Sequence, residues 1–206
     1  MPSDAREELK FKLKRLQKRR PDVFGALGHR FELAEPAGEG ALAEFEREHQ
    51  IVLPEDYRWF LSEIGNGGAG PYYGVFALGE MDDGHGMAAW KEDDGFVGRL
   101  RDPFPHTEAW NDVTGQPDEE DYEPDSLEYE AAFNAFDERY FSPRNVDGAF
   151  PICHLGCALR IWLVVTGPER GRLWLDKRPD YEGLTPLRSD FLSWYTAWVD
   201  ESGARA

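Results

Sequence analysis

The sequence predicts a single α+β domain with a mostly antiparallel or mixed sheet that is flanked by helices. Two apolar segments, 159–165 and 172–176, are separated by a short Gly-Pro turn, which predicts an antiparallel hairpin. Amphipathic segments lie before and after this hairpin, so helices are expected to pack beside the sheet. The 206 residues are 41% hydrophobic and 14% aromatic. A chain of this size and composition can form one core without disulfides or a metal.

The first third of the chain is expected to be helical. Residues 5–20 carry Leu9, Leu13 and Leu16 on one face and basic residues on the other, which predicts an amphipathic helix. Residues 34–40 predict a loop, because they contain two glycines and a proline. The chain is therefore divided into an N-terminal basic helix and loop, residues 1–40, and a domain over residues 41–206.

Two short helices and a sharp turn are expected next. Residues 41–50 predict the first helix, and the second begins at Leu53 and Pro54, because proline is favoured at a first helical position. The glycines at 67 and 68 then predict a turn with positive φ angles. The apolar face of the second helix is formed by Tyr57, Phe60, Leu61 and Ile64.

The middle of the chain has the weakest pattern. Residues 72–78 predict a strand, but residues 80–125 contain acids, turn residues and isolated aromatics. Within that stretch, a short helix is considered within residues 86–100, and residues 115–125 predict an exposed loop. Asp125 or Ser126 then caps a helix that ends near Tyr140. The apolar positions of this helix are Leu127, Ala131, Phe133 (or Ala132) and Phe136.

The final third is expected to be rich in strands. Residues 150–155 predict a strand that precedes the hairpin, and the hairpin sets Trp162 opposite Trp174. Ser189 is the expected N-cap of a last helix over 190–201. The aromatic face of that helix is formed by Phe191, Trp194, Tyr195 and Trp198.

The charge is distributed unevenly. The 40 acidic and 23 basic residues give a net charge of −17, which argues against a nucleic-acid partner. Residues 1–20 carry eight bases and three acids, whereas residues 80–140 carry 19 acids and four bases. This acidic middle is either a solvated surface or a docking face for a basic partner. No apolar run reaches the length of a membrane span, and the charged N-terminus lacks a signal sequence, so a cytoplasmic location is expected.

The sequence contains no recognisable catalytic, metal or cofactor motif. Cys153, His154 and Cys157 provide one close pair of thiols, but a zinc site usually needs a second pair, so both cysteines are expected to be reduced and buried. The glycine-rich turn near residue 67 is not followed by the Lys-Ser/Thr of a phosphate loop. No catalytic residue, metal or cofactor is therefore predicted.

The motifs that carry a family resemblance include Leu53-Pro54, Asn66-Gly67-Gly68, the run 152–157 and the run 162–167. Together they resemble the SUKH superfamily, the family of the Smi/Knr cell-wall assembly regulators. The resemblance extends over about residues 41–200, and its motifs occur in the order expected for the family. The stretch at about 80–147 departs from it, because it is longer and more acidic than the family core. The residues of the shared motifs that we expect to be structural are Leu53, Pro54, Gly67, Gly68, Gly156, Cys157, Trp162, Gly167 and Trp174.

The resemblance implies an α+β binding module rather than an enzyme. Bacterial members are implied to be immunity proteins that bind and neutralise a toxin, often a nuclease, and fungal members to be regulatory interaction proteins. An acidic protein suits a basic nuclease, because opposite charges speed association. The alternatives are a regulatory scaffold or adaptor with a different protein partner, and a hydrolase that uses the acidic residues with a metal.

The expected partner-binding residues lie in the acidic stretch at about 80–147, which we interpret as an insertion. Trp90 and Trp110 are expected to anchor the partner if they are exposed, and otherwise to pack in the core. The acidic residues expected to steer and contact the partner are Asp82, Asp83, Glu92, Asp93, Asp94, Asp118, Glu119, Glu120 and Asp121.

Overall fold

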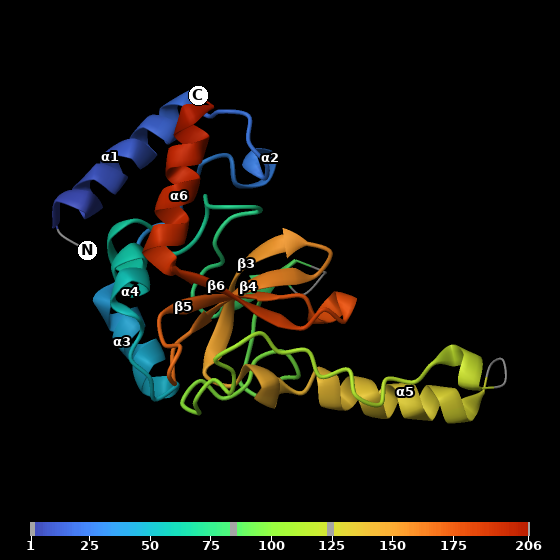
Figure 1. Ribbon diagram of the computed structural model, residues 1–206. Coiled ribbons are helices and arrows are strands. Elements are labelled where there is room, and N and C mark those ends of the chain that lie inside the picture. Colours follow the sequence, from blue (N-terminus) through green and yellow to red (C-terminus); the bar gives the residue numbers. More distant parts are fainter. Residues whose placement is uncertain (1–2, 83–85, 123–125, 206) are drawn as a thin grey trace.

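A four-stranded antiparallel sheet lies at the centre of the fold (Figure 1). The computed structural model describes residues 3–82, 86–122 and 126–205. Each strand of the sheet pairs with the next one in the sequence, so the sheet is a meander, and the predicted hairpin forms its middle pair of strands. The strands are β3 (Ala149–Gly156), β4 (Leu159–Val164), β5 (Arg172–Asp176) and β6 (Leu184–Asp190).

The predicted hairpin has the predicted register, and one strand was missed. Trp162 on β4 lies directly opposite Trp174 on β5. The strand β6 was not predicted, because Pro186 interrupts its pattern and its side chains are mostly only partly buried. Proline is tolerated there because β6 is an edge strand of this sheet.

The segment before the sheet differs from its prediction. Residues 72–78 do not form a regular strand; Val75 makes single bridges to Gly68 and to Cys153. The helix considered within 86–100 is also absent, and the short strands β1 (Glu80–Asp82) and β2 (Met87–Ala89) form a hairpin instead. The pairing of these extended segments depends on contacts between residues that are separated in the sequence. The local periodicity of the sequence therefore does not predict it.

Most of the helices lie to one side of the sheet, whereas α5 projects away from it (Figure 1). Among the described residues, 3₁₀ turns add short connections at 119–121, 143–146 and 178–180. The helices are α1 (Ser3–Arg19), α2 (Ala26–His29), α3 (Glu39–Glu48), α4 (Glu55–Glu63), α5 (Leu127–Tyr140) and α6 (Phe191–Ala204).

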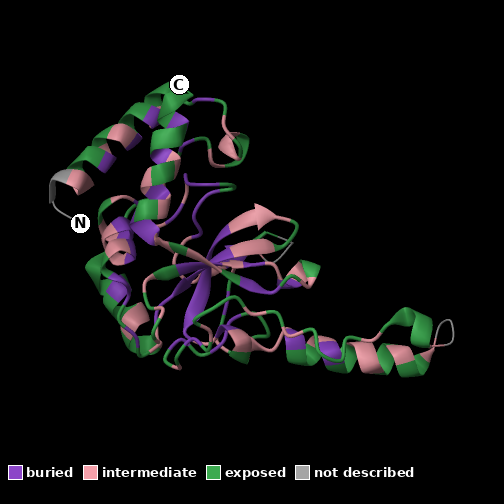
Figure 2. Cartoon of the chain, in the orientation of Figure 1, coloured by how far each residue is buried: buried purple, intermediate pink, exposed green. Residues whose placement is uncertain are grey.

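The basic helix α1 is docked on α6 rather than free (Figure 1). Leu9, Leu13 and Leu16 are at most 3% exposed, as their spacing predicts. Lys12 Nζ lies 2.8 Å from a carboxylate oxygen of Asp200 on α6. Figure 2 shows buried positions along the side of α1 that faces α6. The packing of the three leucines favours a structural role for α1.

The core between the helices and the sheet is aromatic. Tyr57 and Phe60 on α4 are buried, and each ring centroid lies 4.9 Å from that of Phe191 on α6. Pro54 is the N-cap of α4, one residue before the helical position that was predicted for it. The last helix is capped by the side chain of Asp190, which accepts a hydrogen bond from the Ser193 N–H at 2.7 Å, and not by Ser189 as predicted.

The two cysteines have different environments. Cys153 is fully buried, and burial raises the pKa of its thiol. Cys157 is exposed, contrary to the prediction, because it occupies the turn between β3 and β4 with a φ angle of 50°. Gly67 and Gly68 have φ angles of 89° and 104°, as predicted, and a Cβ atom at Gly68 would lie 2.5 Å from a backbone carbonyl oxygen.

Candidate functional site

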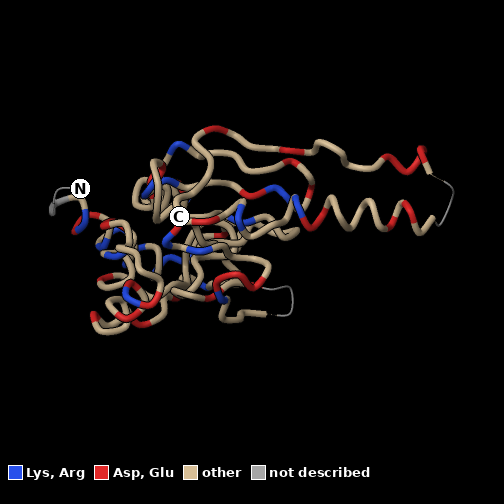
Figure 3. Tube along the Cα trace, turned by 90° about the horizontal axis from the view of Figure 1, so that it is seen from below, with Lys and Arg blue, Asp and Glu red and all other residues tan. Residues whose placement is uncertain are grey.

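Part of the acidic stretch at about 80–147 folds into an arm that projects from the body of the molecule (Figure 1). We define the acidic arm as residues 111–140, which contain α5 and the extended segment that runs back along it. The sequence of the arm has 11 acids and a single base, Arg139. Figure 3 shows acidic residues on both segments of the arm, α5 and the extended segment beside it, near its outer end. The arm is therefore the part of the chain where negative charge extends furthest from the body.

Aromatic side chains join the two halves of the acidic arm. The rings of Tyr122 and Tyr129 are 5.4 Å apart, and those of Tyr129 and Phe133 are 5.8 Å apart. The helix begins after Ser126, whose hydroxyl accepts hydrogen bonds from two backbone N–H groups of the first turn. Leu127 is 79% exposed, so the inner face of α5 includes Tyr129 instead of Leu127. This aromatic contact holds the acidic side chains outward.

The base of the acidic arm is fixed to the sheet by hydrogen bonds and stacked rings. Trp110 exchanges two backbone hydrogen bonds with Leu184 on β6, of 2.9 and 2.7 Å. Its indole ring stacks on Tyr140 at 5.4 Å and on His106 at 5.1 Å. The Tyr140 hydroxyl donates to Asn111 Oδ1 at 2.6 Å. The arm is thus attached through a polar and aromatic joint rather than a flexible linker.

One ion pair at the base uses the single cation of the acidic arm. Arg139 Nη1 lies 2.9 Å from Asp112 Oδ2, and the same guanidinium donates to the Thr114 carbonyl. Hydrogen bonds from the side chain and the backbone N–H of Thr114 lower the pKa of Asp112, and Arg139 lowers it further. Arg139 is therefore engaged near the body, and the tip has no base of its own to offset its acids.

The acids of the tip are exposed. Glu119, Glu120 and Asp121 lie in a 3₁₀ turn that Asp118 caps by accepting the Glu120 N–H at 3.1 Å. The acids of α5, among them Glu128 and Glu130, lie on the same arm and were not predicted as contact residues. Their signal was present, because they alternate with the aromatic positions of the helix. At the tip, the exposed carboxylates are those of Glu119, Glu120, Asp121, Glu128 and Glu130.

The acids predicted nearer the body have structural partners. Glu92 accepts the Leu100 N–H at 3.0 Å and lies 2.9 Å from His49 Nδ1. Asp94 accepts three backbone N–H groups, as in a tight turn. These carboxylates therefore stabilise the loop that follows β2, and only the 118–121 group of the predicted acids belongs to the acidic arm.

Two further predicted acids are paired, and one lies outside the described residues. Asp93 lies 2.9 Å from Arg99 Nε. An Asp82 carboxylate oxygen lies 3.4 Å from His154 Nδ1. Asp83 is not among the described residues. The predicted acids thus divide between the body and the arm instead of forming one surface.

Neither tryptophan is available as an exposed anchor. Trp90 is 6% exposed and packs against Phe45 and Phe150, so of the two expected roles it has the one in the core. Trp110 is partly buried at the base of the acidic arm, where its ring stacks on those of His106 and Tyr140. Large aromatic side chains near a sheet are usually buried, and the sequence alone did not show which neighbours would cover them.

His106 gives the base of the acidic arm a dependence on pH. Burial lowers the pKa of His106 below its ordinary value of 6.5; the hydrogen bond to the Asn145 carbonyl opposes this shift, and the charge of Arg178 adds to it. The unfolded chain then binds a proton more readily than the folded chain, so stability is lost as the pH falls below about 6.5. We expect the urea midpoint to fall between about pH 7 and pH 5, and to fall less in His106→Gln. Equal slopes in both proteins would contradict this expectation.

Within residues 3–82, 86–122 and 126–205, no group of three or more His, Cys, Asp or Glu residues could hold a metal ion. None of the helices in this described part of the chain is both long and apolar enough to cross a membrane.

The comparisons with known proteins identify the family. Residues 36–196 match the model of the SMI1 / KNR4 family (SUKH-1). Neither the curated proteins nor the solved structures contain a match to this chain. The match includes α3, α4, the central sheet and the first turns of α6, in the order that the sequence motifs predict. Because it covers most of the chain, the chain belongs to the SMI1/KNR4 family (SUKH-1).

Proposed function

We propose that this protein is an immunity protein that binds and neutralises a basic toxin, most simply a nuclease, through the tip of the acidic arm. Membership of the family supports a protein-binding, immunity-type module, and proteins of this family are generally not catalytic. The cytoplasm is the compartment in which such a protein would meet an incoming nuclease.

One observation carries the proposal: the exposed carboxylates at the tip of the acidic arm have no ion-pair partner among the described residues. Unpaired charges of one sign on a projecting element produce a strong local potential. A basic partner is attracted to such a surface, and the rate of association rises at low ionic strength. A nuclease must itself attract phosphate, so it offers the opposite charge.

The test is capture of partners from the native lysate at low and high salt, followed by association kinetics with the captured protein. We expect a single basic polypeptide to be retained. Reversing Glu119, Glu120 and Asp121 to Lys should slow its association by about tenfold or more at low salt and flatten the salt dependence. The nuclease activity of the captured protein should also be inhibited by the wild-type chain.

A matched control reverses three exposed acids of the body, Asp22, Glu35 and Glu48. This control changes the net charge by the same amount, so it should slow association by no more than about twofold if the location of the charge matters. Equal effects of the two variants would overturn the assignment to the acidic arm. Retention of housekeeping proteins alone would favour a regulatory scaffold or adaptor instead.

A further inference from the structure

The side of α1 that faces away from the body is strongly basic. Residues 9–21 contain seven bases and no acid, in a chain whose net charge is −17. Positions two residues before or after the buried leucines of α1 lie roughly 200° from them around the helix, so they point to the solvent. We call this side the basic face and define it by its exposed residues Phe11, Lys14, Arg15, Lys18 and Arg19.

The bases of α1 outside the basic face are engaged in ion pairs. Lys10 Nζ lies 3.0 Å from an oxygen of Glu63 on α4 and 3.4 Å from one of Glu7. Lys12 Nζ lies 2.8 Å from an oxygen of Glu8. The bases of the basic face, in contrast, form no ion pair with the part of the chain that the structure describes, although the sequence has 40 acids for 23 bases. Their positive charges are therefore available to an external anion.

A groove of about 200 Å³ between α1 and α6 opens beside the basic face. Arg15 and Arg19 line it from α1 and Asp200 lines it from α6. Lys12 Nζ lies 2.8 Å from the Asp200 carboxylate and neutralises it, so the two guanidinium groups keep an excess of positive charge. Guanidinium groups bind phosphate oxygens through paired hydrogen bonds. The groove therefore suits the phosphate of an anionic headgroup.

Phe11 adds an apolar side chain to the basic face. It is 61% exposed, and the Arg15 guanidinium lies 5.8 Å from the centre of its ring. Such a ring can enter the boundary between the headgroups and the acyl chains of a bilayer while the neighbouring bases contact the headgroups. Clusters of roughly four or more Lys and Arg residues on an amphipathic helix are a common feature of segments that bind anionic lipids.

We infer that the basic face of α1 binds the surface of a membrane that contains anionic lipids, with α1 parallel to that surface. An extended anionic surface contacts the side chains along the whole basic face. A single phosphorylated molecule in the groove would instead leave Phe11, Lys14 and Lys18 uncovered. The attraction adds up over the bases, so the binding is reversible and weakens as the ionic strength rises.

The acidic arm does not oppose this orientation. The helix α1 and the acidic arm lie on opposite sides of the central sheet (Figure 1 and Figure 3). Repulsion between the acids of the arm and the membrane is screened beyond about 8 Å at physiological ionic strength. The arm then points away from the membrane and can bind a partner. The inference does not rest on the proposed function, and neutralising the basic face should leave binding by the arm unchanged.

The test is co-sedimentation of the full chain with vesicles of phosphatidylcholine, alone or with about one third of phosphatidylglycerol. We expect binding to the anionic vesicles only, and binding weaker by about tenfold or more at about 500 mM than at about 50 mM NaCl. The triple variant Lys14→Gln, Arg15→Gln, Lys18→Gln should bind them about thirtyfold or more weakly, because each base near an anionic surface contributes to the attraction. Phe11→Ala should weaken binding by about fivefold.

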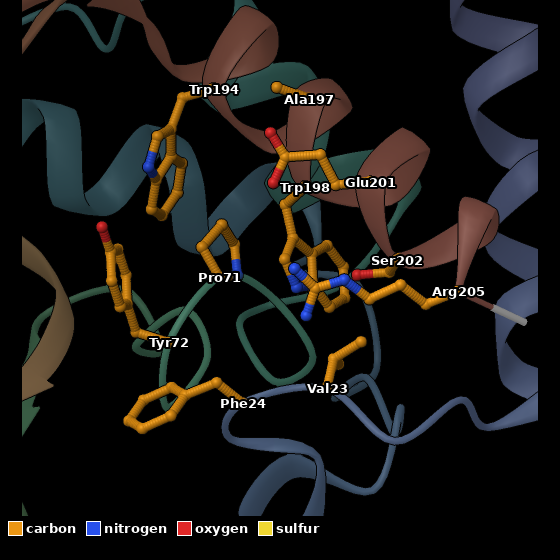
Figure 4. A pocket seen from close by; sticks show the side chains of 10 residues that line it. All are labelled: Val23, Phe24, Pro71, Tyr72, Trp194, Ala197, Trp198, Glu201, Ser202 and Arg205. Atoms are coloured by element: carbon orange, nitrogen blue, oxygen red, sulfur yellow. The ribbon is translucent and has the colours of Figure 1, made fainter.

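Matched controls place the same changes outside α1. Lys91, Arg101 and Arg144 are also exposed, and replacing all three by Gln removes the same charge. Phe24→Ala removes an aromatic ring that is 60% exposed and lines a different groove, beside α6 (Figure 4). Both controls should bind the anionic vesicles as the wild type does. The replaced side chains are exposed, so the circular dichroism spectrum of every variant should match that of the wild type.

Three results would overturn the inference. The first is equal binding of the wild type to both kinds of vesicle, or to neither, and the second is an equal loss in the two triple variants. The third is loss of vesicle binding in about 10 mM inorganic phosphate at constant ionic strength, since the groove alone would then account for the binding. If vesicles are not bound but the basic face binds single-stranded RNA or the acidic arm of a second copy, that ligand takes the place of the membrane.

Discussion

Asp176→Ala is expected to lower the free energy of unfolding by about 3–5 kcal/mol, the usual cost of breaking a buried ion pair from one side. The side chains of Asp176 and Arg178 are only 5% and 6% exposed. Their contact is bidentate, with Nε to Oδ1 at 2.9 Å and Nη2 to Oδ2 at 2.7 Å. The same carboxylate accepts the Arg178 backbone N–H at 2.9 Å. Removing it leaves a buried cation that cannot lose its proton.

The position of this ion pair explains the size of the expected effect. Asp176 is the last residue of β5, and the Arg178 guanidinium lies 5.7 Å from the centre of the Trp162 ring. The loss of Asp176 therefore disturbs a packed aromatic contact as well as the charge pair. Chemical denaturation monitored by circular dichroism measures the change directly.

Two controls separate this effect from an ordinary surface substitution. Lys177 lies between the two residues but pairs with exposed Glu182, so Lys177→Ala should cost less than about 1 kcal/mol. The double variant Asp176→Leu, Arg178→Met should recover much of the lost stability, because it removes the uncompensated charge. If Asp176→Ala and Lys177→Ala prove equally mild, the buried pair does not stabilise the fold as argued.

Trp110→Ala is expected to lower the free energy of unfolding by about 2–3 kcal/mol and to loosen the acidic arm. The indole stacks on Tyr140 of α5 and on His106, and therefore connects the helix to the body. Its backbone hydrogen bonds to Leu184 do not depend on the side chain. The loss of stability in Trp110→Ala should therefore affect the acidic arm more than the sheet.

Amide hydrogen exchange tests this expectation. Exchange should increase along α5 more than along β4 in Trp110→Ala. Val113→Ala is a suitable control, because Val113 lies in the same arm and is 38% exposed. Unchanged exchange along α5 would show that the stacked rings do not hold the arm. If the arm binds the partner, Trp110→Ala should also weaken binding, since a looser arm must be ordered on contact.

The elements with strong local patterns were predicted well. The leucines of α1, the apolar face of α4 and the aromatic face of α6 repeat with the helical period, and each of these segments is a helix. The hairpin of β4 and β5 follows from two apolar segments and a turn, and its register sets Trp162 opposite Trp174. Extended segments such as β6 and residues 72–78 were predicted poorly, because their pairing depends on distant residues.

The candidate sites likewise combine features that the local sequence predicted and features that depend on distant residues. The sequence located the negative charge between residues 80 and 147, and it named the acids at 118–121. It did not separate them from Glu92 and Asp94, whose carboxylates accept hydrogen bonds from nearby backbone N–H groups. The groove lined by Phe24, Tyr72 and Trp194 was not predicted, because these residues come from three separate stretches of the chain.

The sequence by itself determined the family, the helices with a clear apolar period, the central hairpin and the overall acidity of the middle segment. These properties are encoded in neighbouring residues, so composition and spacing reveal them. Only the tertiary structure decided that α5 projects as an arm, that Trp90 is buried and that Phe24, Tyr72 and Trp194 line one groove. Burial and proximity depend on which faces pack together, and that packing joins residues far apart in the sequence.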